Sequence, residues 1–409
     1  MTQVNSDVIV VGAGPTGSFS AVQPAKLGAK VTIFEEHHEV GVPSHCTGHI
    51  SLSGLRRLNL HLPPEVFESE IKSATFHSPS GYRFRVQFAT PITCVVNRTL
   101  LDQHLAKIAE EAGATILRNT RVDSLIVEKD IVRGVAIRKR RGVEKLMSKV
   151  VIDAEGVSSA LLNRAGLHSP DHRMVVNGVQ AEVDGIDDLE HDGVEVFLGQ
   201  SFAPSFFAWI VPRRDGTAKV GLGTAKGNPR DCLRRFVHHN PIVSQRLKCS
   251  RIKSVVYHPI PLGGPIPKSV HNGLLVVGDA ASHVKPTTGG GVVMGLTCAE
   301  IAGKAAADSI RCNDSSAFFL SEYERQWRKR IGFDMDAMKC LRRMLNDFSD
   351  RQLDQLIALC NRLKLEQSLK HVGDVDFQGS SLIRIAKSPR TLSVALYLLK
   401  FGLHSIIAS

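Results

Sequence analysis

The chain has 409 residues, of which 43% are hydrophobic and 22% are charged, so it can bury a large core and is too long for one simple domain. Its 51 Lys and Arg residues outnumber its 40 Asp and Glu residues. The formal net charge of +11 favours an anionic partner such as nucleic acid, an anionic membrane or a phosphorylated substrate. The 8 cysteines form no CxxC pair and no signal-peptide pattern precedes the first strand, which favours reduced cytoplasmic thiols over a disulfide framework.

The N-terminal segment predicts a βαβ nucleotide-binding unit. Its pattern indicates three elements, which are a strand over 7–11, a helix that ends near 28 and a strand over 30–35. In the turn, Gly12 allows a tight bend, Gly14 lets the backbone approach a pyrophosphate at the positive helix end, and Gly17 permits close helix packing. Glu35 closes the second strand, where its carboxylate would accept hydrogen bonds from an adenosine ribose.

A second glycine-rich turn follows a strand predicted over 274–277. There Gly278 and Asp279 precede Pro286 and three glycines that open a long helix. This stretch resembles the second FAD fingerprint of the para-hydroxybenzoate hydroxylase-type flavoproteins, in which the aspartate at this place binds the ribityl chain. The resemblance implies that the backbone N–H groups of Gly290 and Gly291 face the flavin and stabilise its reduced anion.

Two further fragments resemble this family. In "VVIDAEGVSSALLNRAG", Glu155 stands where the family has aspartate, and "NRTLLDQHLAKIAEEAGA" matches a helix whose Arg98 and Asp102 lie beside the cofactor. Four matches in order imply bound FAD. The residues expected to hold it are Gly12, Gly14, Pro15, Gly17, Glu35, Cys46, Arg98, Asp102, Glu155, Gly156, Gly278, Asp279, Pro286, Gly289, Gly290 and Gly291.

Short alternating strands are predicted between the FAD segments. "YRFRVQF" places four apolar side chains on one face, namely Tyr82, Phe84, Val86 and Phe88. Strands around 175–183, 193–198 and 206–223 would complete an antiparallel sheet beside the flavin. The apolar face is either ordinary core or also the wall of a substrate tunnel.

The segment "FFAWIVPRRDGTAKVGLG" resembles the YxWxFP and GxG motif of the geranylgeranyl reductase family, with Phe207, Trp209, Val211, Pro212, Gly221 and Gly223 at the matching places. Flavin-dependent halogenases carry a similar WxWxIP run. The stretch "GVPSHCTGH" at 41–49 discriminates between them, because PxxC followed by glycine is typical of prenyl reductases. The resemblance covers nearly the whole chain.

After residue 311 the pattern becomes helical. One apolar face collects Tyr323, Trp327, Ile331, Met335, Met338, Leu341 and Leu345. The last segment, 391–408, is apolar with a polar stripe of Ser393, Tyr397, Lys400 and His404. A transmembrane span, a helix lying in the membrane plane and a packed cap are all open. We expect the run "RKRR" at 138–141 in a solvated hairpin turn, and no nucleic-acid partner.

The expected fold class is α/β, and α+β overall. It comprises a para-hydroxybenzoate hydroxylase-like FAD-binding Rossmann-type domain, an antiparallel-sheet substrate domain and a C-terminal helical region. The boundaries are 1–60, 95–165 and 270–311 for the FAD-binding domain, 61–94 and 166–269 for the substrate (prenyl) domain, and 312–409 for the helical region.

The resemblance implies an FAD-dependent reductase of isolated C=C bonds in geranylgeranyl chains of (di)geranylgeranylglycerol phospholipids. Trp209 and Phe207 would line the prenyl channel, and Cys46 would position the alkene or help to deliver its proton. A flavin-dependent monooxygenase or halogenase and a non-catalytic prenyl-binding escort protein are the alternatives. NADPH, NADH and ferredoxin are all possible electron donors.

We expect a cytoplasmic enzyme peripherally associated with an anionic membrane, which lifts a prenylated lipid substrate from the surface and takes electrons from a reduced carrier. We expect no metal, because His45, Cys46 and His49 have no further ligands nearby in the sequence.

Overall fold

A computed structural model describes residues 5–139, 142–370, 374–386 and 389–407. Two compact units alternate along the chain. The first unit comprises Met1–Ser44, Arg98–Arg173 and Gly263–Met335, and the second comprises His45–Asn97, Met174–Leu262 and Asp336–Ser409. The expected domains alternate in the same way, but their ends differ, and the expected helical region from 312 is divided between the units at Met335.

The described part of the first unit contains an eight-stranded sheet with the Rossmann-type parallel pattern. Its main path runs in the order β17 (Val270–His271), β18 (Leu274–Val276), β11 (Gly142–Asp153), β1 (Ser6–Val11), β2 (Val31–Phe34) and β8 (Thr115–Leu117). All pairs on this path are parallel except β17 with β18. The strands β9 (Val122–Glu128) and β10 (Ile131–Lys139) extend the sheet from β11 as antiparallel neighbours. The central strands read as apolar runs because both faces are covered.

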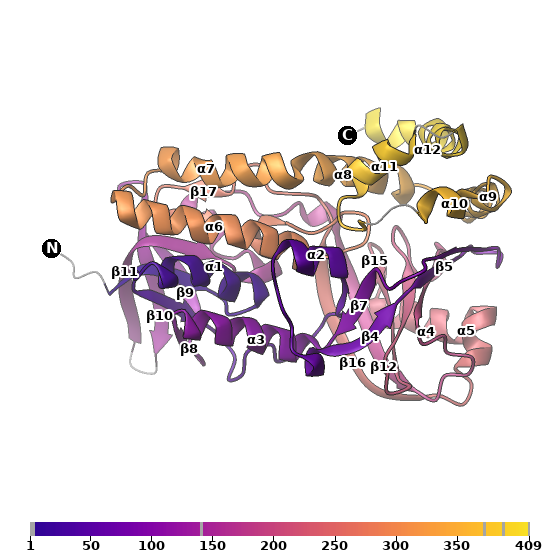
Figure 1. The fold of residues 1–409 in the computed structure, drawn as a ribbon, viewed down its shortest axis with the longest axis horizontal. Helices are drawn as coiled ribbons and strands as arrows, with labels where there is room; N and C mark the ends of the chain where they lie inside the picture. Colours follow the sequence, from indigo (N-terminus) through magenta and orange to yellow (C-terminus); the bar gives the residue numbers. More distant parts are fainter. Residues whose placement is uncertain (1–4, 140–141, 371–373, 387–388, 408–409) are drawn as a thin grey trace. The chain divides into compact units, whose positions relative to one another are not determined.

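Helices cover this sheet, and their bounds are α1 (Pro15–Lys26), α3 (Arg98–Glu111), α6 (Val292–Cys312) and α7 (Ala317–Trp327). Figure 1 shows α6 and α7 running side by side, and the two helices are in contact. The helices α1 and α6 pack closely, since a Cβ added at Gly303 would lie 2.5 Å from the backbone oxygen of Ser20. The two helices that begin with glycine-rich turns therefore pack against each other within the first unit.

The predicted apolar face after residue 311 is confirmed only in its first part. Tyr323, Trp327, Ile331, Met335 and Met338 are buried across α7, a π-helical turn at Arg328–Gly332 and the start of α8 (Phe333–Asn346). The next two predicted positions are wrong, because Leu341 and Leu345 are only half-buried.

Arg342 takes a buried position further along α8. Its guanidinium donates to the Ser205 carbonyl at 2.8 Å and lies 4.9 Å from the centre of the Phe206 ring. Burial lowers the pKa of Arg342 to about 10. An arginine can face a core when its N–H groups find such partners, so hydrophobic periodicity alone misplaces this face.

The described part of the second unit contains a seven-stranded sheet. Its order is β16 (Arg251–Pro261), β12 (Val175–Asp184), β15 (Ala218–Thr224), β14 (Ala208–Pro212), β13 (Gly193–Phe197), β5 (Ser73–His77) and β6 (Arg83–Gln87). The prediction of an antiparallel sheet is correct with one exception, because β13 and β5 pair in parallel. These two strands come from separate segments of the chain, so no hairpin imposes an antiparallel direction on them.

The apolar face of β6 is core. Phe84 and Val86 are buried against Ile357 and Cys360 of α9 (Asp350–Arg362), as the core interpretation of this face predicts. Tyr82, predicted on the same face, precedes the strand and is 54% exposed, because it lies in the turn before β6.

The remaining described elements of the second unit are β3 (His49–Ser51), α2 (Leu52–Arg57), η1 (Pro64–Val66), β4 (Phe67–Ile71), β7 (Thr93–Val96), α4 (Pro229–His239), α5 (Pro241–Arg246), α10 (Leu365–Leu369), α11 (Gln378–Ala386) and α12 (Pro389–Ile407). The strands β3, β7 and β4 form a small sheet in that order. Side chains of α4 and α5 pack on one face of the large sheet. On the other face, Val194 and Val211 pack against Ile71 of β4 and Val95 of β7.

The C-terminal helix α12 turns its tyrosine toward the protein. Tyr397 donates to the Gln352 carbonyl at 3.0 Å, and Leu392, Leu396 and Leu399 are 53%, 57% and 41% exposed. Within the described ranges, the structure contains no helix with both the length and the apolar character to cross a membrane. The side chain of His404 and the residues Arg140 and Arg141, which were part of the predicted patterns, lie outside what the structure describes.

Candidate active site

The turn between β1 and α1 is built for close backbone approach. A Cβ at Gly12 would lie 2.5 Å from the Ala154 oxygen, and one at Gly17 would lie 1.9 Å from the Gly12 oxygen. At Gly14, by contrast, an added Cβ would meet no atom within 4 Å. Gly14 is the N-cap of α1, with Pro15 as the first helical residue, so the open side of the turn lies at the positive end of the helix.

One acidic side chain, that of Glu35, contacts this turn. The Glu35 carboxylate follows β2 and accepts the Ala13 N–H at 2.9 Å, and its other oxygen accepts the His37 N–H at 3.0 Å. The His37 ring Nδ1 also lies 2.7 Å from the Oε1 atom. Because a carboxylate has about four lone-pair sites, these three partners leave Glu35 able to accept one ribose hydroxyl.

Arg98 and Asp102 form a two-pronged ion pair at the start of α3, with contacts of 3.1 and 3.2 Å. Burial raises the pKa of Asp102, and the charge of Arg98 opposes this effect. The same two influences act on Asp279, since burial raises the pKa of its carboxyl and the charge of Arg98 again opposes the rise. The charge of Arg98 therefore acts on both Asp102 and Asp279, two residues predicted from different motifs.

The segment after β11 is held by its own side chains. The Glu155 carboxylate accepts the Leu161 N–H at 2.8 Å and the Ser158 hydroxyl at 3.0 Å, so it shapes its own loop. Gly156 follows with a φ of +82°, and a Cβ there would meet no atom within 4 Å. Asp153 is fully buried, and burial followed by the charge of Glu155 raises the pKa of Asp153 well above its ordinary range.

The segment that opens α6 meets α1 through Thr16. A Cβ at Gly278 would lie 3.0 Å from the Thr16 hydroxyl oxygen, and one at Gly295 would lie 2.8 Å from it. The Asp279 carboxylate lies beside the N-cap of α6, since a Cβ at Gly291 would be 3.0 Å from its Oδ1 atom. The segment between them contains the other predicted positions, namely the buried Pro286, Gly289 with a φ of +74°, and the half-buried Gly290.

These features fit a dinucleotide. Gly14 and Gly156 leave open space on the backbone, and the N-termini of α1 and α6 offer N–H groups to anions. Among the described groups, none donates a hydrogen bond to the Asp279 carboxylate, which leaves it able to accept a ribityl hydroxyl. The predicted FAD residues of the first unit therefore come together, whereas Cys46 belongs to the second unit.

The second unit has an aromatic cluster on the face of its large sheet opposite α4 and α5, where Trp209 packs against Ile71 of β4 and Val95 of β7. Trp209 on β14 lies opposite Gly221 on β15, where a Cβ would be 2.7 Å from the indole ring. Its Nε1–H donates to Gln180 Oε1 at 3.3 Å, and Phe207 meets the ring edge-on with centroids 6.0 Å apart. Both glycines of the GxG motif make room for aromatic rings. A Cβ at Gly223 would lie 2.5 Å from the Phe206 ring, which stacks on Phe207.

The loop that contains Cys46 lies over this same face. Lys219, two residues before Gly221 on β15, donates from Nζ to the Thr47 carbonyl at 3.0 Å, and residues two apart on a strand share a face. The His45 ring stacks on His258 of β16 with centroids 5.1 Å apart. Since Cys46 lies between these two anchored residues, the structure brings it to the face that carries Trp209.

An ion-pair network fixes the lysine that holds the Cys46 loop. Lys219 is only 9% exposed, and its Nζ also lies 3.3 Å from Glu68. Arg213 pairs with Glu68 at 2.8 Å and with Glu182 at 2.7 Å. Burial lowers the pKa of Arg213, but the two carboxylates outweigh this effect and raise it overall. Buried charges that share partners in this way hold one geometry, because breaking a pair leaves a charge without compensation.

The histidines of the Cys46 loop have separate partners. His49 Nε2 lies 2.7 Å from the Thr93 hydroxyl, and His45 stacks on His258. No group of three or more His, Cys, Asp or Glu residues that could hold a metal ion occurs within the described ranges. Cys46 is half-buried, and its sulfur accepts the Gly48 N–H at 3.4 Å.

Sequence reasoning missed four residues that organise the two sites, namely Thr16, Asp153, Gln180 and Lys219. The only sequence signal for Lys219 is a charge within an otherwise apolar strand, "AKVGLG". Asp153 precedes Glu155 in a fragment that was compared with a family motif, but its burial follows from strand pairing with β1 and β18. Thr16 and Gln180 carry no distinctive pattern.

The Rossmann-type sheet, the paired glycine-rich helix starts and the acids around them define an FAD-binding flavoprotein. A family model described as an FAD binding domain matches residues 5–330, which is most of the chain. The chain also belongs to the family of digeranylgeranylglycerophospholipid reductases. It is 34% identical to digeranylgeranylglycerophospholipid reductase 2 of Methanothermobacter thermautotrophicus over 357 residues, 86% of this chain and 90% of that relative. Its identity to the Methanopyrus kandleri protein of the same name is 32% over 405 residues, 97% of this chain and 98% of the other.

Solved structures agree with this assignment. A geranylgeranyl bacteriochlorophyll reductase-like protein from Thermoplasma acidophilum superimposes with a TM-score of 0.84 at 26% identity, covering 96% of this chain and 99% of that one. A flavin-dependent brominase shares the fold with a TM-score of 0.70 at 18% identity, covering 94% of this chain and 100% of its own. The predicted fold class, family and FAD cofactor are therefore confirmed, and the reductase interpretation is favoured over the halogenase and escort alternatives.

Proposed function

We propose that this protein reduces isolated C=C bonds in the geranylgeranyl chains of digeranylgeranylglycerol phospholipids, a step in membrane lipid biosynthesis. The observation that carries the proposal is the identity to reductases of that name over almost the whole chain. The attachment of the Cys46 loop to the same strand that packs against Trp209 supports it, because aromatic rings and a half-buried thiol suit an apolar, branched chain.

The residues have separate tasks in this proposal. When bound, the reduced flavin supplies a hydride equivalent, and the other alkene carbon needs a proton. Trp209 and Phe207 bind the prenyl chain and stabilise cationic character in the alkene by about 0.5–2 kcal/mol through their ring faces. Cys46 positions the alkene and helps to deliver the proton to its second carbon. Lys219 holds the Cys46 loop in place through the Thr47 carbonyl.

An anaerobic assay tests the activity. Sodium dithionite as the reductant removes the need to know whether NADPH, NADH, ferredoxin or another carrier serves as the donor. Incubation with digeranylgeranylglyceryl phosphate should give mass gains of two hydrogens per bond. A product that forms only in the presence of oxygen would instead support a halogenase or hydroxylase.

The variant Cys46→Ala tests the site. We expect it to retain FAD and the wild-type unfolding temperature but to reduce the lipid at least tenfold more slowly, on the order of 1.4 kcal/mol of barrier. Cys340→Ala is the matched control, since Cys340 is also a half-buried free thiol of the second unit. Equal rates in the two variants would remove Cys46 from the proposed chemistry.

The proposal includes peripheral binding to an anionic membrane. It is supported by the exposed leucines of α12 and the net charge of +11. Changing Leu392, Leu396 and Leu399 together to serine in the full chain should reduce sedimentation with anionic liposomes. Phe318→Ser, at an 88% exposed position of the first unit, should not reduce it. If the triple variant sediments like the wild type, α12 has no part in membrane binding.

A further inference from the structure

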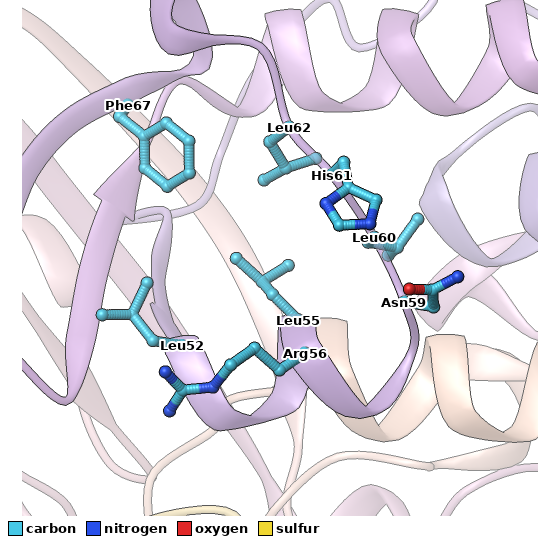
Figure 2. Close-up of a pocket in the computed structure, with 8 residues that line it drawn as sticks. All are labelled: Leu52, Leu55, Arg56, Asn59, Leu60, His61, Leu62 and Phe67. Atoms are coloured by element: carbon cyan, nitrogen blue, oxygen red, sulfur yellow. The ribbon is translucent and has the colours of Figure 1, made fainter.

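A leucine-lined hollow lies in the second unit around α2 and the chain that follows it (Figure 2). Its volume is about 370 Å³, within the range of roughly 300–1,000 Å³ typical of ligand pockets. Five of its lining residues are large and apolar, namely Leu52, Leu55, Leu60, Leu62 and Phe67. None of the residues assigned above to FAD or to the Trp209 face lines it.

The polar groups of this hollow lie with Arg56, Asn59 and His61. Arg56 shares a face of α2 with Leu52, four residues earlier, and Figure 2 shows its guanidinium extending beside that leucine. The Arg56 guanidinium makes no ion pair or hydrogen bond with any group that the structure describes. The hollow therefore combines an aliphatic wall with an uncompensated positive charge.

The neighbouring Arg57 differs from Arg56, because its guanidinium has carboxylate partners. Arg57 pairs with Asp374 and with Asp376, the latter at 3.0 Å, and its guanidinium lies 4.5 Å from the centre of the Phe377 ring. The contacts of Arg57 also attach α2 to the segment that leads directly into α11. Arg57 is thus a structural residue, whereas Arg56 is available to a ligand.

We propose that this hollow is a subsite for the lipid substrate, in which the phosphate pairs with Arg56 and the adjoining isoprenoid hydrocarbon lies on the leucine wall. The inference rests on the proposed function and adds where the headgroup end of the lipid binds. A branched hydrocarbon matches the aliphatic wall, and a phosphate matches the single cation. A free phosphate would leave the leucines unused, and a neutral prenyl alcohol would leave Arg56 without a counter-charge.

Binding measurements on the FAD-loaded full chain in detergent test the subsite without depending on catalysis. The probes are digeranylgeranylglyceryl phosphate, glycerol phosphate, geranylgeraniol and a diacyl phosphatidic acid. Arg56→Gln should weaken the affinity for the prenyl phosphate lipid about tenfold and leave that for geranylgeraniol unchanged, since a hydrogen bond to a charged group contributes roughly 1.5–3 kcal/mol. Leu60→Trp, which fills the hollow, should weaken both affinities.

The matched control is Arg234→Gln, which removes an exposed arginine of the same unit from α4. Equal affinities for the prenyl phosphate lipid in Arg56→Gln and Arg234→Gln would overturn the subsite. Equal affinities of the wild type for the prenyl lipid and diacyl phosphatidic acid would overturn it in favour of a general membrane contact. If the wild type binds the prenyl lipid as expected but dithionite produces no mass gain, the proposed activity fails while the binding result remains.

Discussion

Substitution of Gly14 separates cofactor binding from folding. Gly14 has a φ of −62° and a ψ of 178°, which any residue adopts, and its added Cβ meets no atom within 4 Å. We therefore expect Gly14→Val to change the free energy of unfolding of the apoprotein by less than about 1 kcal/mol. The valine side chain would occupy the space through which a pyrophosphate approaches the N-terminus of α1.

The loss of affinity follows from the hydrogen bonds that are blocked. Two bonds to a charged group contribute about 1.5–3 kcal/mol each, so losing both lowers FAD affinity about 10²- to 10⁴-fold. The flavin-to-protein ratio after purification and titration of the apoprotein with FAD measure this loss. Gly17→Ala is the contrasting variant, because its Cβ would lie 1.9 Å from the Gly12 oxygen and should destabilise the apoprotein itself. Wild-type FAD affinity in Gly14→Val would refute the placement of the pyrophosphate at this turn.

Three further predictions concern the packing around the sites. Lys219→Met leaves the Thr47 carbonyl without its donor, so we expect a loss of about 1–3 kcal/mol in unfolding free energy and faster alkylation of Cys46 by iodoacetamide. An unchanged alkylation rate would show that Lys219 does not hold the loop. Gly221→Ala places a Cβ 2.7 Å from the Trp209 ring, which should cost about 1–3 kcal/mol and shift indole fluorescence, and an unshifted spectrum would contradict the contact. Burial lowers the pKa of His283 from 6.5 to about 3, so the unfolded chain takes up this proton first as the pH falls and native stability declines between pH 6.5 and 3. Urea unfolding at pH 7 and pH 5 should show the wild type losing about 2 kcal/mol more than His283→Phe, and equal losses would contradict the burial of a neutral imidazole.

The FAD half of the site was largely predictable from the sequence because its determinants are local. Gly12, Gly14 and Gly17 lie within one turn. A positive φ and a close backbone contact restrict Gly12 to glycine, and a close backbone contact restricts Gly17, whereas Gly14 leaves open space at the helix N-terminus. The strand-turn-helix order around Asp279 is equally local. Hydrophobic alternation also located β6, β12 and β13 to within a few residues and the β14–β15 pair as one stretch, but it did not predict β5 or β16.

The surroundings of Cys46 depended on tertiary structure. Lys219 follows Thr47 by 172 residues in the chain, and no periodicity indicates that its ammonium reaches that carbonyl. The same is true of Arg342, which is buried because Ser205 and Phe206 of another segment receive its guanidinium. A hydrophobic pattern states which side of an element is apolar but does not state which partner will cover it.

The sequence by itself determined the nucleotide turns, the fold class and the family, because each depends on residues close together in the chain or on a motif that spans one element. Only the tertiary structure decided that the Cys46 loop is attached through Thr47 to Lys219, and that Tyr397 packs inward while the leucines of α12 face outward. It also decided that, among the described residues, the Arg57 guanidinium has carboxylate partners and the Arg56 guanidinium has none. These outcomes depend on strand register and helix rotation, which set long-range neighbours and change with the packing of the whole unit.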